Sequence, residues 1–91
     1  MKIGRFERTE QGFKGRIITF ECQSEKVEIR SKKEEGAYDV LINGADVGYA
    51  KVSGVDRDVI VVQIDDPSFD APIEAQLRPD GIWFALERKR S

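Results

Sequence analysis

The sequence predicts an all-β domain, an antiparallel meander of about seven short strands that forms a small barrel or sandwich. Two features of the chain predict this fold class. Apolar and polar residues alternate along most of the chain, as they do in strands that bury one face. Turn-forming residues interrupt the alternation at intervals of about 8 to 12 residues, and no stretch has the apolar spacing of an amphipathic helix longer than one turn.

Length and composition favour one domain over residues 1–91. The 91 residues are 40% hydrophobic and 35% charged, which suits a single core and is too apolar for a disordered chain. The net charge of −2 argues against a general binder of nucleic-acid backbones. No apolar run approaches the roughly 20 residues of a membrane-spanning helix, and the single cysteine, Cys22, fits a reducing compartment. We therefore expect a cytoplasmic protein that binds no membrane.

The residue types that usually carry catalysis are scarce. The chain has no histidine, the commonest general base and metal ligand, and Cys22 lacks the cationic neighbour that would activate a thiol. Ser68 would need a base other than histidine to act as a nucleophile. An enzyme is therefore the least favoured class, and we expect no catalytic residue, no cofactor and no metal.

The N-terminal segments predict a hairpin. Residues 3–8 and 13–20 are strand-like, and residues 9–12 supply the turn between them. In the return limb, Phe13 and Ile17 share one face, because side chains two and four positions apart in a strand point the same way.

The next segment predicts a half-exposed strand followed by a solvent-exposed loop. Residues 26–30 alternate strictly, which places Val27 and Ile29 inward. Residues 31–36 carry the densest charge in the chain and end in glycine, as loops often do.

A second hairpin is predicted by the pair Asn43-Gly44, the strongest two-residue turn signal in the chain. Its limbs are residues 38–42 and 47–52. Gly48 lies inside the second limb, where glycine indicates a bulge or a close approach of another backbone.

The most apolar run, residues 59–64, predicts a buried central strand, and a rigid elbow follows it at residues 65–73. The elbow consists of Asp65, Asp66, Pro67, Ser68, Phe69, Asp70 and Pro72, before Ile73. Its two prolines prevent a helix or an uninterrupted strand, its aspartates and serine can cap the turn, and Phe69 supplies an apolar anchor.

The three aspartates of the elbow also suggest a second interpretation. Carboxylates that come from one loop can bind a hard cation such as calcium. Capping of the turn is favoured, because the prolines stiffen the loop and the glycine and glutamate positions of a calcium loop are absent.

The C-terminal part predicts a last hairpin. Apolar and polar residues alternate over residues 73–77, which places Ile73, Ala75 and Leu77 inward, and residues 79–81 predict a tight turn. In residues 82–89 the side chains of Ile82, Phe84 and Leu86 are expected on one face, and those of Trp83, Ala85 and Glu87 on the other.

Three motifs of this chain resemble a small bacterial family known as domain of unknown function 736. They are Met1-Lys2-Ile3-Gly4, Gly12-Phe13-Lys14-Gly15 with Ile17 following, and Asp65-Asp66-Pro67-Ser68-Phe69 with Ala71-Pro72-Ile73. The resemblance runs nearly end to end, and the third motif is its specific part. It implies a cytoplasmic β fold and a setting on proteobacterial plasmids and integrative elements, and it implies no reaction. The chain departs from the family pattern at Ala50 and Leu86, where members tend to carry tryptophan.

The sequence leaves two functional hypotheses. The favoured one is a non-enzymatic protein-interaction module of a mobile genetic element, which binds a transfer, replication or host-defence component of the CRISPR type. Trp83 and Tyr49 are the expected anchors, because large amphipathic rings dominate interface hot spots. The alternative is an accessory protein that binds single-stranded nucleic acid through an aromatic and basic sheet face, assisted by Arg88, Lys89 and Arg90.

Overall fold

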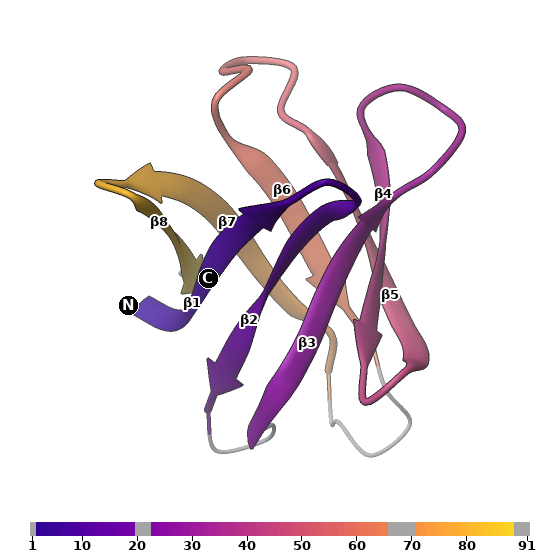
Figure 1. The fold of residues 1–91 in the computed structure, drawn as a ribbon, viewed down its shortest axis with the longest axis vertical. Coiled ribbons are helices and arrows are strands. Elements are labelled where there is room, and N and C mark those ends of the chain that lie inside the picture. The colour runs from indigo at the N-terminus through magenta and orange to yellow at the C-terminus, as the bar shows by residue number, and fades with distance from the viewer. Residues whose placement is uncertain (1, 20–22, 66–70, 89–91) are drawn as a thin grey trace.

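A computed structural model describes residues 2–19, 23–65 and 71–88. These residues form an eight-stranded antiparallel barrel in which each strand pairs with its neighbours in sequence (Figure 1). The strands are β1 (Lys2–Thr9), β2 (Gly12–Ile18), β3 (Gln23–Ser31), β4 (Ala37–Ile42), β5 (Ala45–Val52), β6 (Ile60–Ile64), β7 (Ile73–Asp80) and β8 (Trp83–Arg88).

Pairing between the first and last strands closes the barrel. β1 lies antiparallel to β8, with Gly4 opposite Leu86 and Phe6 opposite Phe84. The all-β antiparallel meander predicted from the sequence is confirmed. Because the sheet is closed, the fold is a barrel and not a sandwich, and it has eight strands instead of about seven. Because β1 and β8 pair with each other, neither is left as an exposed sheet edge.

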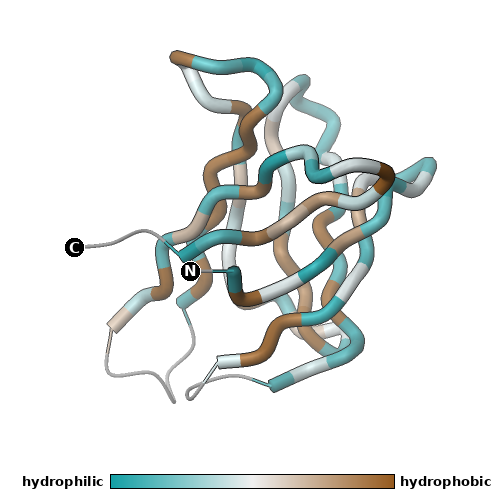
Figure 2. The backbone as a smooth tube through the Cα atoms, turned by 90° about the vertical axis from the view of Figure 1, so that its left-hand side faces the viewer, coloured by the Kyte–Doolittle hydropathy of each residue, from teal (hydrophilic) through white to brown (hydrophobic). Residues whose placement is uncertain are grey.

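The barrel interior is filled by the inward half of each alternating strand. The buried cluster consists of Ile3, Phe6, Phe13, Ile17, Val27, Ile29, Val40, Ala50, Ile60, Val62, Ile64, Ile73, Ala75, Leu77 and Leu86. Figure 2 shows the result as brown and teal segments that alternate along the strands. The inward positions predicted for Val27, Ile29, Ile73, Ala75 and Leu77 are therefore confirmed. No polar side chain is buried in the part of the chain that the structure describes.

Two predictions for the C-terminal half need correction. Residues 59–64 do not form a strand buried on both faces, because the outside of a barrel meets solvent, and Val61 in β6 is 37% exposed. The expected turn at residues 79–81 lies one residue later. β7 continues to Asp80, which pairs with Trp83, so Gly81 and Ile82 form the turn.

The position of Pro79 explains this shift. β6 reaches only as far as Leu77, so Pro79 lies where β7 has a partner on one side alone, a position that tolerates a proline. Ile82 consequently projects from the turn with 86% of its surface exposed and does not share the buried face of Leu86.

Gly48 fulfils both roles expected for a strand glycine. Gly48 pairs with Val40 and Asp46 pairs with Leu41, so Val47 is an extra residue and forms a bulge. A Cβ atom at Gly48 would overlap the carbonyl oxygen of Gln63 on β6. The backbone of β5 therefore approaches β6 at a point where no side chain fits.

The Asn43-Gly44 turn joins β4 to β5 as predicted. Asn43 and Gly44 have φ angles of 53° and 83°, the left-handed pair typical of a two-residue hairpin turn.

We expect Gly44→Ala to lower the free energy of unfolding by about 1 to 2 kcal/mol, the usual cost of placing a side chain in the left-handed region. No heavy atom lies within 4 Å of the new Cβ, so steric overlap adds nothing. Urea denaturation checks this value, and an unchanged midpoint would contradict the strain assigned to the turn.

Candidate binding groove over strands β8, β1, β2 and β3

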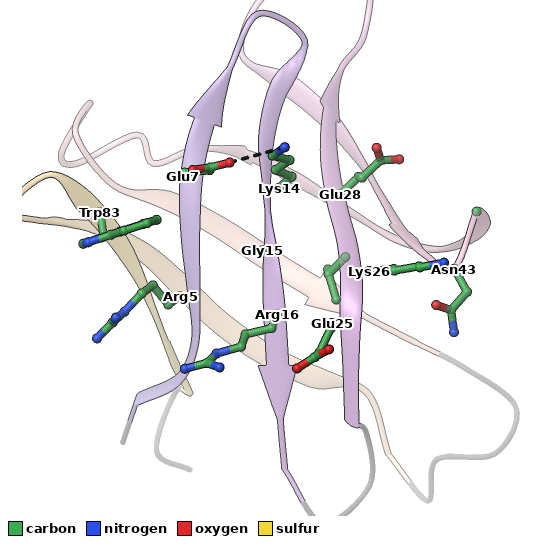
Figure 3. A pocket seen from close by; sticks show the side chains of 12 residues that line it. Arg5, Glu7, Lys14, Gly15, Arg16, Glu25, Lys26, Glu28, Asn43 and Trp83 are labelled. Atoms are coloured by element: carbon green, nitrogen blue, oxygen red, sulfur yellow. Dashed lines mark ion pairs between the residues drawn. The ribbon is translucent and has the colours of Figure 1, made fainter.

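An open groove of about 940 Å³ lies on the outer face of the barrel. It is lined by Arg5, Glu7, Lys14, Gly15, Arg16, Glu25, Lys26, Val27, Glu28, Asn43, Gly44 and Trp83. These residues come from β1, β2, β3, β8 and the β4–β5 turn, and most of their side chains are charged (Figure 3). The groove is therefore a mixed-charge surface with one large ring at its β8 side.

Trp83 supplies that ring. It is the first residue of β8, it is followed by Phe84, which packs against the core, and it is 39% exposed. The guanidinium carbon of Arg5 on β1 lies 5.7 Å from the centre of the Trp83 ring, within the range of a cation–π contact. This contact joins residues 78 positions apart in sequence and exists only because β8 pairs with β1.

Arg5 and Arg16 form a cross-strand pair of like charges. They are directly opposite in the β1–β2 ladder, and both side chains point outward and are exposed. Figure 3 shows both guanidinium groups directed toward the β8 side of the groove. Within the described residues, neither arginine has a carboxylate within the 4.0 Å of an ion pair, although Glu25 lies on the β3 side of Arg16.

The neighbouring charges are largely paired. The Nζ atom of Lys14 lies 3.4 Å from Oε1 of Glu7 on the adjacent strand. The Nζ atom of Lys2 lies 2.9 Å from Oδ2 of Asp80. A second, smaller depression of about 370 Å³ adjoins the groove and shares Arg5, Arg16 and Trp83 with it. These three residues therefore lie where the two depressions meet, and among the described residues the two arginines have no ion-pair partner there.

Comparison with known proteins assigns a family but no activity. The sequence model of a family described as "Protein of unknown function (DUF736)" matches residues 2–90. The chain belongs to the DUF736 family. The resemblance predicted from the three motifs is thus confirmed, and no curated protein and no solved structure matches this chain.

Tyr49, the second expected anchor, lies elsewhere on the DUF736 barrel. It is on the outer face of β5, 52% exposed, and its hydroxyl donates a hydrogen bond of 2.8 Å to Oε1 of Gln63 on β6. Strands β6 and β7 separate β5 from β8, so Tyr49 and Trp83 do not belong to one patch.

The basic tail and the elbow are only partly described. Arg88 is a half-buried residue at the end of β8 and pairs with Ala75 in the ladder, whereas the predicted Lys89 and Arg90 lie outside the described residues. In the elbow, Asp65 and Pro72 are exposed, and the amide of Asp65 donates to the carbonyl of Val47 over 2.7 Å. The predictions for Asp66, Pro67, Ser68, Phe69 and Asp70 fall outside the described residues.

Ala50 and Leu86, where the resemblance described above leads us to expect tryptophan, are interior positions. Ala50 is 2% and Leu86 0% exposed, and both belong to the buried cluster. Both side chains therefore lie inside the barrel and do not line the groove.

Metal-binding clusters and membrane-spanning helices are both absent from the described ranges. Residues 2–19, 23–65 and 71–88 contain no group of three or more histidine, cysteine, aspartate or glutamate residues that could hold a metal ion. The same ranges contain no helix with the length and hydrophobicity needed to cross a bilayer.

Arg5 and Arg16 are not among the binding residues expected from the sequence. A signal for them exists, because the turn at residues 9–12 fixes the register of the first hairpin, and that register places Arg5 opposite Arg16. Their proximity to Trp83 has no local signal, since it depends on closure of the barrel.

Proposed function

We propose that this DUF736 protein is a non-enzymatic protein-interaction module that binds its partner through the groove over β8, β1, β2 and β3. The observation that carries the proposal is Trp83, exposed beside Arg5 at the point where two depressions meet. Tryptophan and arginine are the residue types most enriched in interface hot spots, and an anchor residue acts best beside a concavity.

The charge of the groove supports a protein partner over nucleic acid. Its lining contains four basic residues, Arg5, Lys14, Arg16 and Lys26, against three acidic ones, Glu7, Glu25 and Glu28. A strand of nucleic acid presents a phosphate at every residue and favours a continuous basic track with several stacking rings. This groove offers one ring and carboxylates along its length.

The family resemblance supports the cellular setting of the proposal. A module encoded on a plasmid or integrative element would act in the cytoplasm on a transfer, replication or host-defence component, including one of the CRISPR type.

A pull-down with tagged wild type and two single variants, Trp83→Ala and Tyr49→Ala, tests this function. The lysate should come from a bacterium that carries the element encoding the protein. We expect wild type and Tyr49→Ala to retain the same partner and Trp83→Ala to lose it, because only Trp83 lies in the groove. Circular dichroism melting of each variant verifies that the barrel is intact.

Two outcomes would contradict the proposal. If Trp83→Ala retains the partner and Tyr49→Ala loses it, the interface lies on β5 instead. Salt-sensitive retention of single-stranded DNA or RNA in a gel shift, abolished by Trp83→Ala, would favour the nucleic-acid alternative.

A further inference from the structure

We infer that Arg5, Arg16 and Trp83 together form a carboxylate-binding site that takes one acidic side chain of the partner, with an apolar residue next to it packed on Trp83. This inference rests on the proposed function and specifies the chemistry that the groove recognises.

The like-charged pair is the first argument. Like charges directly opposite each other in an antiparallel ladder are destabilising, so folding alone gives no reason to place Arg5 opposite Arg16. An anion bound between the two guanidinium groups would turn this repulsion into two attractive contacts. Lys2 and Lys14 near the site do not need such an anion, because each already has an acidic partner.

The geometry of the guanidinium group is the second argument. Arginine presents a planar set of donors that matches the two oxygens of a carboxylate, which a lysine ammonium does not. Arg5 is also held in place by its contact with the Trp83 ring, so less side-chain freedom is lost when a ligand binds.

The apolar surface beside the arginines is the third argument. The second depression, which Trp83 also lines, contains Ile18, which is 57% exposed, and the buried Ala85. A leucine or phenylalanine adjacent to the acidic residue could cover this surface while its neighbour reaches the arginines.

The surrounding carboxylates favour a single acidic residue over a chain of phosphates. Glu7, Glu25 and Glu28 line the groove around the arginine pair, and Asp80 lines the adjoining depression. A phosphodiester strand that crossed the arginines would meet these carboxylates in both directions, whereas one side chain of a peptide would not.

Fluorescence of Trp83, the single tryptophan of the chain, tests the site directly. The probe is the peptide acetyl-Ala-Glu-Leu-Leu-Ala-amide, titrated into the full-length protein, with the peptide carrying glutamine in place of glutamate as its neutral counterpart. We expect the acidic peptide to change the emission of Trp83 and to bind at least tenfold more tightly than the neutral one. We expect Arg16→Gln to weaken binding of the acidic peptide at least tenfold and Arg16→Lys to weaken it several-fold, because lysine keeps the charge and loses the planar donor set.

Lys51→Gln is the matched control. It removes one exposed positive charge from β5, outside both depressions, and should leave the affinity within twofold of wild type. Equal affinity for the two peptides, or an equal loss with Arg16→Gln and Lys51→Gln, would overturn the inference. Tighter binding of an eight-residue oligothymidylate than of the acidic peptide would overturn it in favour of nucleic acid.

The pull-down separates this inference from the proposed function. If the partner is lost with Trp83→Ala but kept by the double variant Arg5→Gln, Arg16→Gln, the carboxylate site is overturned and the interaction module stands. If the acidic peptide binds as expected and the partner depends on Tyr49 instead of Trp83, the carboxylate site stands and the proposed interface is overturned.

Discussion

Gly15→Ala is expected to lower the free energy of unfolding by about 3 kcal/mol, at the upper end of the cost of overpacking a core. A Cβ atom at Gly15 would overlap the carbonyl oxygen of Arg5 and lie 2.7 Å from the Cα of Phe6. Both atoms belong to the backbone of β1, which cannot withdraw without loosening the β1–β2 ladder. Urea denaturation followed by circular dichroism measures the loss.

Gly54→Ala is the control for that substitution. Gly54 lies in the loop before β6, and a Cβ atom added to it would have no heavy atom within 4 Å, so the change in stability should be less than about 0.5 kcal/mol. A Gly15→Ala variant that unfolds at the same urea concentration as Gly54→Ala would show that β1 and β2 are not constrained as described.

Phe6→Ala is expected to cost about 3 to 5 kcal/mol, the usual range for removing a buried aromatic ring. Phe6 is 1% exposed and is among the largest fully buried side chains of the described core. A domain of this size is commonly stable by only about 5 to 14 kcal/mol, so the variant should unfold well below the wild-type temperature. Thermal melting followed by circular dichroism checks this.

Val55→Ala is the control for Phe6→Ala. Val55 is 98% exposed, so the same kind of truncation removes no buried contact and should leave the melting temperature unchanged. Similar melting temperatures for the two variants would contradict the assignment of Phe6 to the core.

Much of the fold could be predicted because its determinants are local. The alternation around Val27 and Ile29 predicts which face of β3 is buried. The pair Asn43-Gly44 predicts the hairpin turn, and Gly48 predicts the bulge in β5. The prediction of the turn near Pro79 was wrong because its position depends on where β6 begins, which the residues of β7 and β8 do not encode.

The candidate site was predicted only in part, for the same reason. Trp83 could be singled out, because large amphipathic rings dominate interface hot spots. Its relation to Arg5 and Arg16 could not be found, because the choice between a barrel and a sandwich depends on pairing between β1 and β8. Alternation alone is compatible with both architectures.

The pairing of the first strand with the last also determines when the groove can exist during synthesis. Trp83 belongs to β8, and Arg5 and Arg16 belong to the first hairpin, so both ends of the chain must be free to meet before the site is assembled. The hairpin can form early, since its contacts are local, whereas the β1–β8 contact spans nearly the whole chain and forms late. The nascent chain therefore cannot recognise a partner through this groove until β8 has left the ribosome, and a translation product that stops before Trp83 would lack the site.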